Sequence, residues 1–190
     1  ETTKEIDLPE LIRYGKSKNV GIILWLPWTT VDAHIDNIFA KYAEWGVKGV
    51  KIDFMDRQDQ WMVNYYERVV KEAAKHHILV DFHGAYKPSG LEIRYPNLLS
   101  YEGVRGLEYN DWVDPENSIY QPFIRNAVGP MDFTPGAMSS AQPEHVKNTD
   151  PVPMTAGTRS YHMALFVAFE SGIQMLADSP TRYYENPECT

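Results

Sequence analysis

The chain has 190 residues, of which 43% are hydrophobic and 23% charged, and these proportions exclude an intrinsically disordered or low-complexity protein. Its formal net charge of -8 argues against nucleic acid as a partner, because binding a phosphate backbone needs a basic surface. No apolar run approaches the roughly 18 residues that a membrane-spanning helix requires, so we expect no membrane insertion.

Along the chain, the apolar pattern alternates between the 3.6-residue period of helices and the short apolar runs of buried strands. The first helix is expected to have Asp7 as its N-cap and Pro9 in its first turn, and the second to end at Gly46. The predicted elements are a helix at 8–18, a strand at Val20–Leu26, a helix through 35–42, a strand at Val47–Phe54, a helix at 62–73, strands at Ile78–Phe82 and Leu98–Glu102, a helix at Tyr161–Phe169 and a return strand near Gly172–Ala177.

This β-α-β order predicts parallel strands joined by right-handed crossovers, in either a doubly wound open sheet or a (β/α)₈ barrel. No glycine-rich phosphate-binding turn follows the first strand, which counts against a dinucleotide-binding sheet. Polar side chains follow the strands at their carboxyl ends, where barrel enzymes place their chemistry. We therefore favour an α/β fold of the (β/α)₈, TIM-type barrel class.

A closed barrel takes about 250 residues, whereas only five or six strands are predicted here. We therefore expect residues 1–190 to be part of a single catalytic barrel domain that is incomplete in this chain. Residues 113–153 are rich in proline, asparagine and aspartate, and their periodicity is weak. We interpret them as a long decorated βα loop within that domain.

The strongest local signal is Lys51-Ile52-Asp53 at the end of a predicted strand. Alternation along the strand places Lys51 and Asp53 on the same face, pointing into the barrel mouth. A carboxylate beside an ammonium group stays ionised at neutral pH, as a nucleophile must. The alternative is a structural Lys–Asp pair that closes the end of the barrel.

A second signal is the segment from Glu102 to Glu108, which contains Gly103 and Gly106. The two glycines indicate a tight turn that can aim both carboxylates into one pocket, where an acid with a raised pKa can protonate a leaving group. Hard oxygen ligands of this kind also suit calcium, whereas no histidine or cysteine spacing supports zinc. The alternative is a pair of solvated loop glutamates.

Weaker candidates lie at other strand ends. His83 can hydrogen-bond a ligand hydroxyl, although a lone histidine at a strand end is more often structural. Trp28 is a candidate stacking platform for a sugar ring, while Trp25 is expected in the core. Asp132 can hold a substrate hydroxyl, although aspartates in such positions commonly form turns.

Four segments together resemble glycoside hydrolase family 97: GVKGVKIDFMDRQDQ, DFHGAYKPSGLEIRYPNLLSYEGVRGLEYNDW, GPMDFTPGAM and MLADSP. The resemblance covers nearly the whole chain from Val20 onward. It implies a (β/α)₈ barrel between flanking β-domains, with a calcium ion at the active site. By that comparison the chain is most of the barrel, without its first strand and without the flanking β-domains.

Within that family, the resemblance matches Glu108 to the general acid and Glu102 to a calcium-binding glutamate. Inverting members carry a catalytic base after the histidine that corresponds to His83, and this chain has Gly84 there. Retaining members carry an aspartate nucleophile at the end of a Lys-x-Asp strand, which Asp53 matches. The resemblance therefore implies a retaining α-galactosidase that acts by double displacement, with calcium held near Glu102 and Glu108.

Two alternatives stay open at this point. One is an inverting, α-glucosidase-type relative whose base comes from elsewhere; the other is a sugar-binding or inactive barrel fragment. Members of the family are typically exported by bacteria, so we expect a periplasmic or otherwise exported protein, although residues 1–20 contain no signal-peptide pattern. The expected partner is an α-galactoside substrate.

Overall fold

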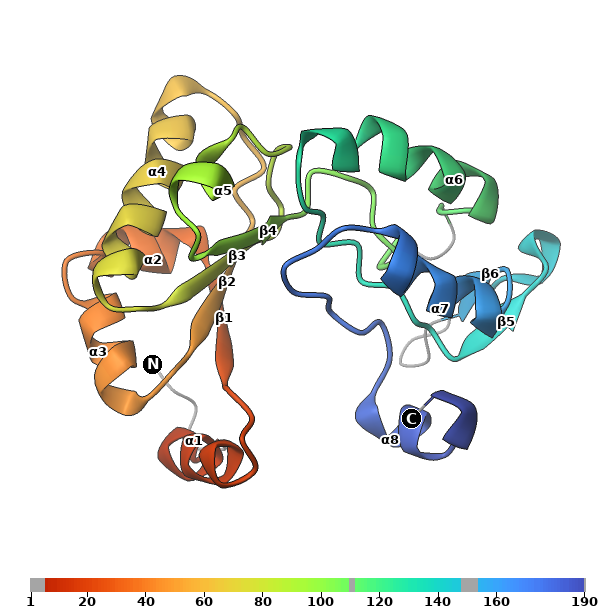
Figure 1. The fold of residues 1–190 in the computed structure, drawn as a ribbon, viewed down its shortest axis with the longest axis horizontal. Coiled ribbons are helices and arrows are strands. Elements are labelled where there is room, and N and C mark those ends of the chain that lie inside the picture. The colour runs from red at the N-terminus through yellow and green to blue at the C-terminus, as the bar shows by residue number, and fades with distance from the viewer. Residues whose placement is uncertain (1–5, 110–111, 148–153, 190) are drawn as a thin grey trace. The chain divides into compact units, whose positions relative to one another are not determined.

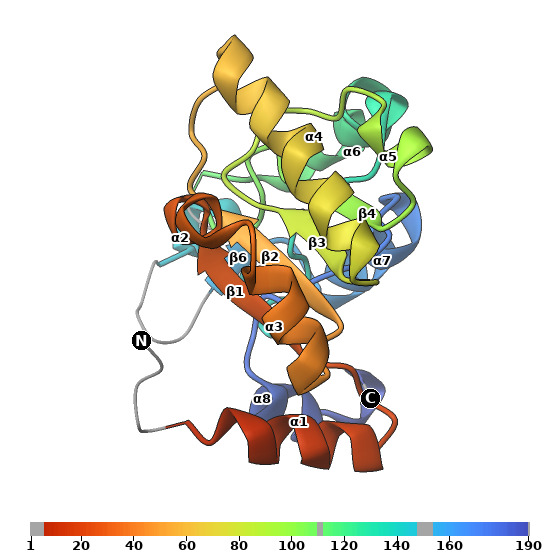
Figure 2. The same cartoon turned by 90° about the vertical axis from the view of Figure 1, so that its left-hand side faces the viewer.

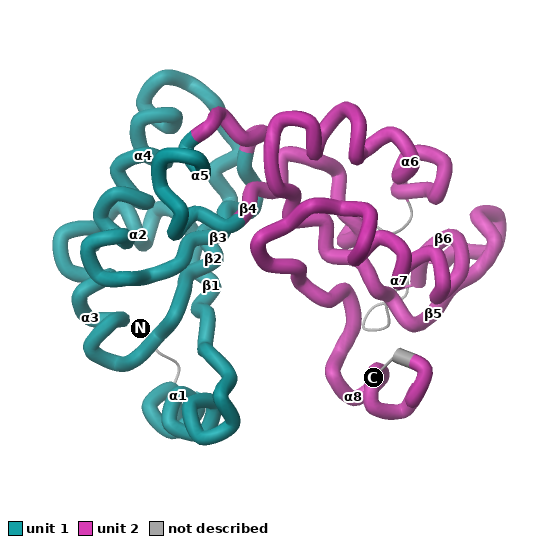
Figure 3. The backbone as a smooth tube through the Cα atoms, in the orientation of Figure 1, with its two compact units in different colours: residues 1–85, 91–99 teal, residues 86–90, 100–190 magenta. Residues whose placement is uncertain are grey.

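The computed structural model describes residues 6–109, 112–147 and 154–189. The chain divides into two compact units, which Figure 3 shows in different colours. The first unit comprises residues 1–85 and 91–99, and the second comprises residues 86–90 and 100–190. The assignment of residues 1–190 to a single catalytic domain stays a prediction.

The first unit is built on a sheet with the strand order β1-β2-β3-β4, in which β1 pairs with β2 and β2 with β3 in parallel (Figure 1). The fourth strand leaves this unit at residue 99 and ends in the second unit. The elements are α1 (Leu8–Ser17), β1 (Ile23–Pro27), α2 (Trp28–His34), α3 (Ile38–Trp45), β2 (Gly49–Asp53), α4 (Gln60–Lys75), β3 (Leu79–Phe82), α5 (Leu91–Arg94) and β4 (Leu98–Tyr101). The predicted parallel α/β fold is confirmed.

The two faces of this sheet differ in chemistry because parallel strands in register present paired residues on the same side. One face is apolar and consists of Leu24, Leu26, Val50, Ile52, Val80 and Phe82. Figures 1 and 2 show helices α2, α3 and α4 covering one side of the sheet, and the Tyr66 ring of α4 meets the Phe82 ring edge-on at 4.6 Å. The opposite face carries Trp25, Lys51 and Asp81 in register.

Among the helices of the first unit, α1 and α4 follow the predicted ranges, α3 differs in extent, and α2 and α5 were not predicted. Asp7 caps α1 by accepting from the backbone N–H of Glu10, as predicted. Gly46 ends α3 in the left-handed conformation, with φ of 92°, which an L side chain rarely adopts. The helix predicted through residues 35–42 is wrong in extent, because a turn at Ile35–Asn37 separates α2 from α3.

The second unit packs helices around a core of its own. Its elements are α6 (Pro115–Ile124), η1 (Asn126–Val128), β5 (Ser139–Ala141), η2 (Pro143–His145), β6 (Met154–Ala156), α7 (Arg159–Ala168), α8 (Pro180–Tyr184) and η3 (Pro187–Cys189), with β5 and β6 paired in parallel. The core contains Leu107, Val113, Met131, Phe133, Ala137, Leu165 and Phe169. Throughout the described ranges, no helix combines the length and the apolarity needed to cross a membrane.

The segment 113–153, expected as a long decorated βα loop, carries α6, η1, β5 and η2 within its described residues. Residues 148–153 lie outside the described part of the chain. The return strand predicted near Gly172–Ala177 is wrong: these residues form bends and irregular structure. Gln174 in this stretch donates from Nε2 to the carbonyls of Phe166 and Phe169, so its side chain satisfies the end of α7.

The second unit extends the end of β4 with one more parallel pairing. Tyr101 forms a parallel bridge with Met131, and the N–H of Asp132 donates to the carbonyl of Tyr101 at 2.8 Å. The N–H of Met131 in turn donates to the carbonyl of Glu170 at 2.9 Å. The backbone around Met131 and Asp132 therefore lies directly beside the end of β4, and this pairing positions acidic residues from both segments.

Candidate active site

In the first unit, Asp53 ends β2 with its side chain largely buried, at 6% exposure. Its Oδ2 accepts a hydrogen bond from the indole Nε1 of Trp25 at 2.8 Å, and its Oδ1 accepts from the backbone N–H of Phe54 at 2.6 Å. Both oxygens are thus oriented by a donor, and each keeps a further lone pair. The carboxylate is held ready for chemistry that needs a fixed oxygen position.

The backbone turns sharply just after Asp53. Phe54 has φ of 67° and Asp56 has φ of 44°, and both values lie in the left-handed region that non-glycine residues seldom occupy. Backbone strain of this kind clusters at functional sites, where surrounding contacts hold it in place. The turn aims the N–H of Phe54 at Asp53 and sets the Phe54 ring edge-on against Trp25, with ring centroids 5.5 Å apart.

The expectation that Trp25 lies in the core is wrong, because this side chain is 50% exposed. The register explains the difference: Trp25 pairs with Lys51 and therefore stands on the polar face of the sheet. Its indole N–H reaches the Asp53 carboxylate two residues further along the neighbouring strand. The run Val20–Leu26 is apolar throughout, so its sequence does not show which face of the sheet Trp25 occupies.

Gly84 lies directly against the Asp53 carboxylate. Its φ is 56°, and a Cβ atom there would lie 2.7 Å from the backbone nitrogen of Phe54 and 2.9 Å from Oδ1 of Asp53. Two backbone hydrogen bonds hold the strand ends together, from the N–H of His83 to Ile52 and from the N–H of Asp56 to the carbonyl of Gly84. Position 84 therefore has no room for a side chain while Asp53 occupies its observed place.

Lys51 forms an ion pair with Asp81 on the next strand, with Nζ and Oδ2 3.5 Å apart. The sequence predicts this ammonium group beside Asp53, and that neighbourhood stays a prediction next to the observed pair with Asp81. Asp81 is 2% exposed and was not among the predicted site residues. The sequence could have indicated Asp81, because an aspartate inside a buried strand needs a partner to offset the free-energy cost of burying its charge. His83, also predicted for the site, is buried at the end of the same strand.

Trp28 starts α2 and belongs to an aromatic cluster with Trp61 and Tyr65 of α4. Its ring meets that of Trp61 edge-on at 5.8 Å and that of Tyr65 at 5.7 Å, while its carbonyl accepts from the Tyr65 hydroxyl. The cluster fixes the position of Trp28. Its role as a platform for a sugar ring stays a prediction.

In the second unit, Glu102 follows β4 and is 7% exposed, while Glu108 is exposed. A carboxylate oxygen of each lies within 4.8 Å of the other. The turn between them is pinned by the N–H of Leu107, which donates to the carbonyl of Phe133 at 2.8 Å, and a Cβ at Gly106 would lie 2.9 Å from that same oxygen. The structure thus brings the two glutamates together, and two carboxylates at this spacing match the hard oxygen ligands that calcium prefers.

Asp132 is fully buried in the second unit, where its backbone pairs with Tyr101 beside the end of β4. The hydroxyl of Thr134 lies 3.4 Å from Oδ1 of Asp132, at the long end for a hydrogen bond. Asp132 therefore stands on the strand-like segment next to the one that leads into Glu102. Its contact with a substrate hydroxyl stays a prediction.

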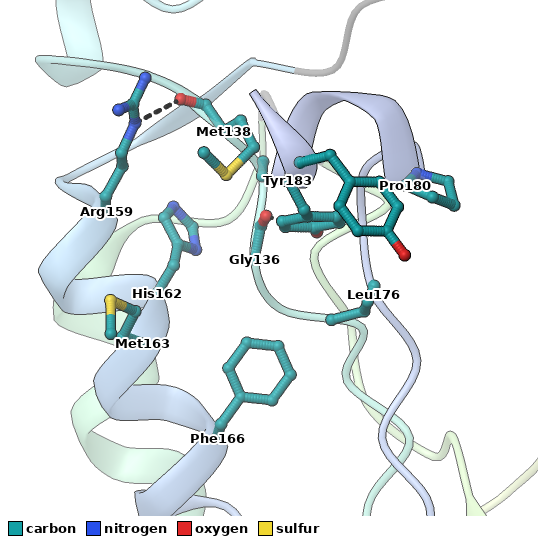
Figure 4. Close-up of a pocket in the computed structure, with 11 residues that line it drawn as sticks. Gly136, Met138, Arg159, His162, Met163, Phe166, Leu176, Pro180 and Tyr183 are labelled. Carbon is teal, nitrogen blue, oxygen red and sulfur yellow. Dashed lines mark hydrogen bonds between the residues drawn. The ribbon is translucent and has the colours of Figure 1, made fainter. Parts of the chain in front are cut away.

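A separate apolar pocket of about 680 Å³ lies in the second unit between α7, α8 and the Gly136–Met138 segment (Figure 4). His162 lines it and is 2% exposed, with Nε2 2.5 Å from the hydroxyl of Thr155; burial lowers the pKa of His162 to about 4. None of the predicted site residues lines this pocket. It is therefore distinct from the carboxylate arrangement described above.

Comparisons with known proteins agree on one family. The family model described as glycoside hydrolase 97 matches residues 1–104. A retaining alpha-galactosidase of Bacteroides thetaiotaomicron is 45% identical over 195 residues, covering 100% of this chain and 30% of that protein. A probable retaining alpha-galactosidase of Streptomyces bingchenggensis is 36% identical over 183 residues, covering 95% of this chain and 27% of that protein.

Solved structures agree with the sequence comparisons. A glycoside hydrolase family 97 enzyme from Pseudoalteromonas sp. strain K8, in complex with acarbose, matches 100% of this chain and 32% of its own, at 29% identity and a TM-score of 0.84. The site itself defines an α/β protein whose carboxylates follow the carboxyl ends of parallel strands. The chain belongs to glycoside hydrolase family 97. It spans about 30% of the length of the curated relatives that it matches.

Proposed function

We propose that the protein to which this chain belongs hydrolyses terminal α-galactosides with retention of the anomeric configuration. The observation that carries this proposal is the arrangement of Asp53 and Gly84. A side chain at position 84 would overlap the space of Oδ1 of Asp53 and of the Phe54 nitrogen, so the chain presents an oriented carboxylate on β2 and none at position 84. Similarity to one protein named a retaining alpha-galactosidase and to another named a probable retaining alpha-galactosidase supports the same proposal.

The reaction we infer has two displacements. In the first, a carboxylate oxygen of Asp53 attacks the anomeric carbon while Glu108 gives its proton to the departing glycosidic oxygen. In the second, Glu108 takes a proton from water, the water oxygen bonds to the anomeric carbon, and the bond to Asp53 breaks. Retaining glycosidases place the two carboxyl groups about 5–5.5 Å apart, and this distance between Asp53 and Glu108 stays a prediction.

We also propose calcium as the resident metal, with Glu102 and Glu108 among its ligands. The two carboxylate oxygens within 4.8 Å of one another fit such an ion, because calcium takes several oxygen ligands at short range. When bound, the ion supplies positive charge that offsets the repulsion between these carboxylates. The backbone just before Glu108 is fixed where the N–H of Leu107 donates to the carbonyl of Phe133.

The remaining predicted residues have roles in substrate binding. We propose that Lys51, His83 and Asp132 bind sugar hydroxyls and that Trp28 stacks on a sugar ring. The same proposal includes a complete (β/α)₈ barrel, flanking β-domains in the longer parent chain, and export from a bacterial cell. The parallel sheet and the 30% coverage of the relatives support the barrel and the flanking domains.

The experiment is azide rescue of Asp53→Gly in the full-length parent enzyme with an aryl α-galactoside. We expect turnover to fall by at least a thousandfold and azide to restore it, yielding the β-galactosyl azide because azide enters from the face that Asp53 vacates. Asp56→Gly is the matched control, since Asp56 is exposed and its left-handed backbone suits glycine. Wild-type turnover in Asp53→Gly would overturn the assignment, and galactoside binding without any turnover by the parent would favour the sugar-binding alternative.

A further inference from the structure

Arg125 is a buried cation at the end of α6, at 5% exposure, that the predicted site does not include. Its guanidinium group donates to five backbone carbonyls. These are Tyr101 at 3.0 Å, Glu102 at 3.1 Å and Pro130 at 2.9 Å from Nη2, Gly103 at 3.2 Å from Nε and Gly129 at 3.0 Å from Nη1. Burying a charge is costly unless it is hydrogen-bonded, and this ring of carbonyls provides the compensation.

The five carbonyls belong to two short segments that lie side by side. One is the end of β4 with Glu102 and Gly103; the other leads into Met131 and Asp132, and the two are joined by the parallel bridge between Tyr101 and Met131. The planar fork of an arginine carries five N–H donors in fixed directions, which suits it to tying several acceptors together. Lysine has a single ammonium group and cannot span both segments in the same way.

We call Arg125 and the five carbonyls that it binds the clamp. The backbone that follows the clamp, from Gly103 to Leu107, is tightly constrained. Gly103 has φ of 47°, and a Cβ atom there would lie 2.7 Å from the backbone nitrogen of Lys87. At the far end, the N–H of Leu107 is fixed on the carbonyl of Phe133. Arg125 at one end and the Leu107 hydrogen bond at the other therefore fix both ends of the backbone segment that runs from Glu102 towards Glu108.

We propose that Arg125 is a positioning residue for the metal and the acid: it holds the backbone of Glu102 so that the Glu102 and Glu108 carboxylates converge on one cation. This inference rests on the proposed function, since it assigns a device that serves the same site. Outer residues that orient metal ligands typically contribute 10- to 100-fold to metal affinity. We expect an effect of that size from a residue that touches neither the metal nor the substrate.

The test is a calorimetric titration of the metal-free, full-length parent enzyme with Ca²⁺, with Arg125→Lys compared against wild type. We expect the dissociation constant to rise about 10- to 100-fold in Arg125→Lys. Arg159→Lys is the control, because Arg159 also donates from Nε to a backbone carbonyl in this unit, that of Met138. Its Ca²⁺ affinity should stay within twofold of wild type. Arg125→Gln, which keeps two donors in one plane, replaces the lysine variant if circular dichroism shows that variant unfolded.

Further results distinguish a failure of the inference about Arg125 from a failure of the proposed function. Wild-type Ca²⁺ affinity in a folded Arg125 variant with a lowered melting temperature would overturn the inference and leave Arg125 a purely structural residue. If the wild-type enzyme cleaves galactosides but binds no Ca²⁺, the metal proposal fails. The kcat of the Arg125 variant then decides the clamp. A tenfold fall in kcat at unchanged KM supports the positioning role, and an unchanged kcat overturns it. If the enzyme binds Ca²⁺ but cleaves no galactoside, the titration still decides the clamp while the proposed function fails.

Discussion

Gly84 and Asp53 share one small volume: a Cβ atom added to Gly84 would lie 2.9 Å from Oδ1 of Asp53 and 2.7 Å from the nitrogen of Phe54. Real Cβ atoms do not approach other atoms this closely, so a side chain at position 84 is incompatible with the observed positions of the Phe54 backbone and the Asp53 carboxylate. The carboxylate of Asp53 is present at this site, and no carboxylate stands at position 84. This arrangement is the structural basis on which we favour a retaining over an inverting mechanism.

Gly84→Ala should reduce kcat of the parent enzyme by at least a hundredfold, because the new methyl group displaces Asp53 or the backbone of Phe54. Gly90→Ala is a close control: Gly90 also has positive φ, 91°, but a Cβ there meets no atom within 4 Å. Both variants carry backbone strain of about 1 kcal/mol or more, and only the first meets the carboxylate. Steady-state kinetics that show equal activity for the two variants would contradict the account.

Trp25→Phe should lower kcat about tenfold with little change in KM, because the indole N–H donor to Oδ2 of Asp53 is lost while an aromatic ring remains at the position. Trp45→Phe provides the comparison, since Trp45 is also partly exposed but stands on α3 against Tyr42. Its kinetics should match wild type. Full activity in Trp25→Phe would mean that this hydrogen bond does not position Asp53 for catalysis.

Lys51→Met should destabilise the fold by about 3 kcal/mol, because Asp81 is 2% exposed and loses its cation. The double variant Lys51→Met with Asp81→Asn should recover part of that loss, and a double-mutant cycle in urea measures the coupling. Lys75→Met is the control, as its pair with Glu72 is on the surface and contributes about 0–1 kcal/mol. If the change in unfolding free energy of the double variant equals the sum of the two single changes, the Lys51–Asp81 pair is not coupled.

His162 predicts a pH dependence of stability in the second unit. Burial lowers its pKa to about 4, so between pH 6.5 and pH 4 the unfolded chain binds a proton that the folded chain does not. Stability from this residue is therefore complete above pH 6.5 and lost as the pH falls, by about 2 kcal/mol between pH 7 and pH 4.5. Urea unfolding at the two pH values should show a smaller difference in His162→Gln than in wild type, whereas the exposed His145→Gln should leave the difference unchanged.

Local patterns predicted the elements that depend on local rules. The cap at Asp7 was found as predicted, and the apolar run predicted as a strand at Val47–Phe54 contains β2, Gly49–Asp53. The failures arise from contacts that local patterns do not contain. Trp25 is exposed because its register with β2 places it on the polar face of the sheet, and irregular structure stands where the return strand was predicted, with Gln174 donating to the carbonyls of Phe166 and Phe169.

The site shows the same division. Asp53, Glu102 and Glu108 were proposed from the sequence because carboxylates near strand ends stand out there, and their roles stay predictions. Arg125 was not proposed, because the carbonyls of Tyr101, Glu102 and Gly103 that it binds lie 22 to 24 residues earlier in the chain. Hydrogen bonds to backbone carbonyls leave no pairing signal in side-chain types. Such contacts emerge only when the fold brings the segments together.

The most direct test of the retaining mechanism is a proton NMR time course of an aryl α-galactoside with the calcium-loaded parent enzyme. Our account predicts that the first galactose to appear is the α-anomer, which then mutarotates towards equilibrium. A β-anomer as the first product would contradict the double displacement and reduce Asp53 to a base or a structural residue.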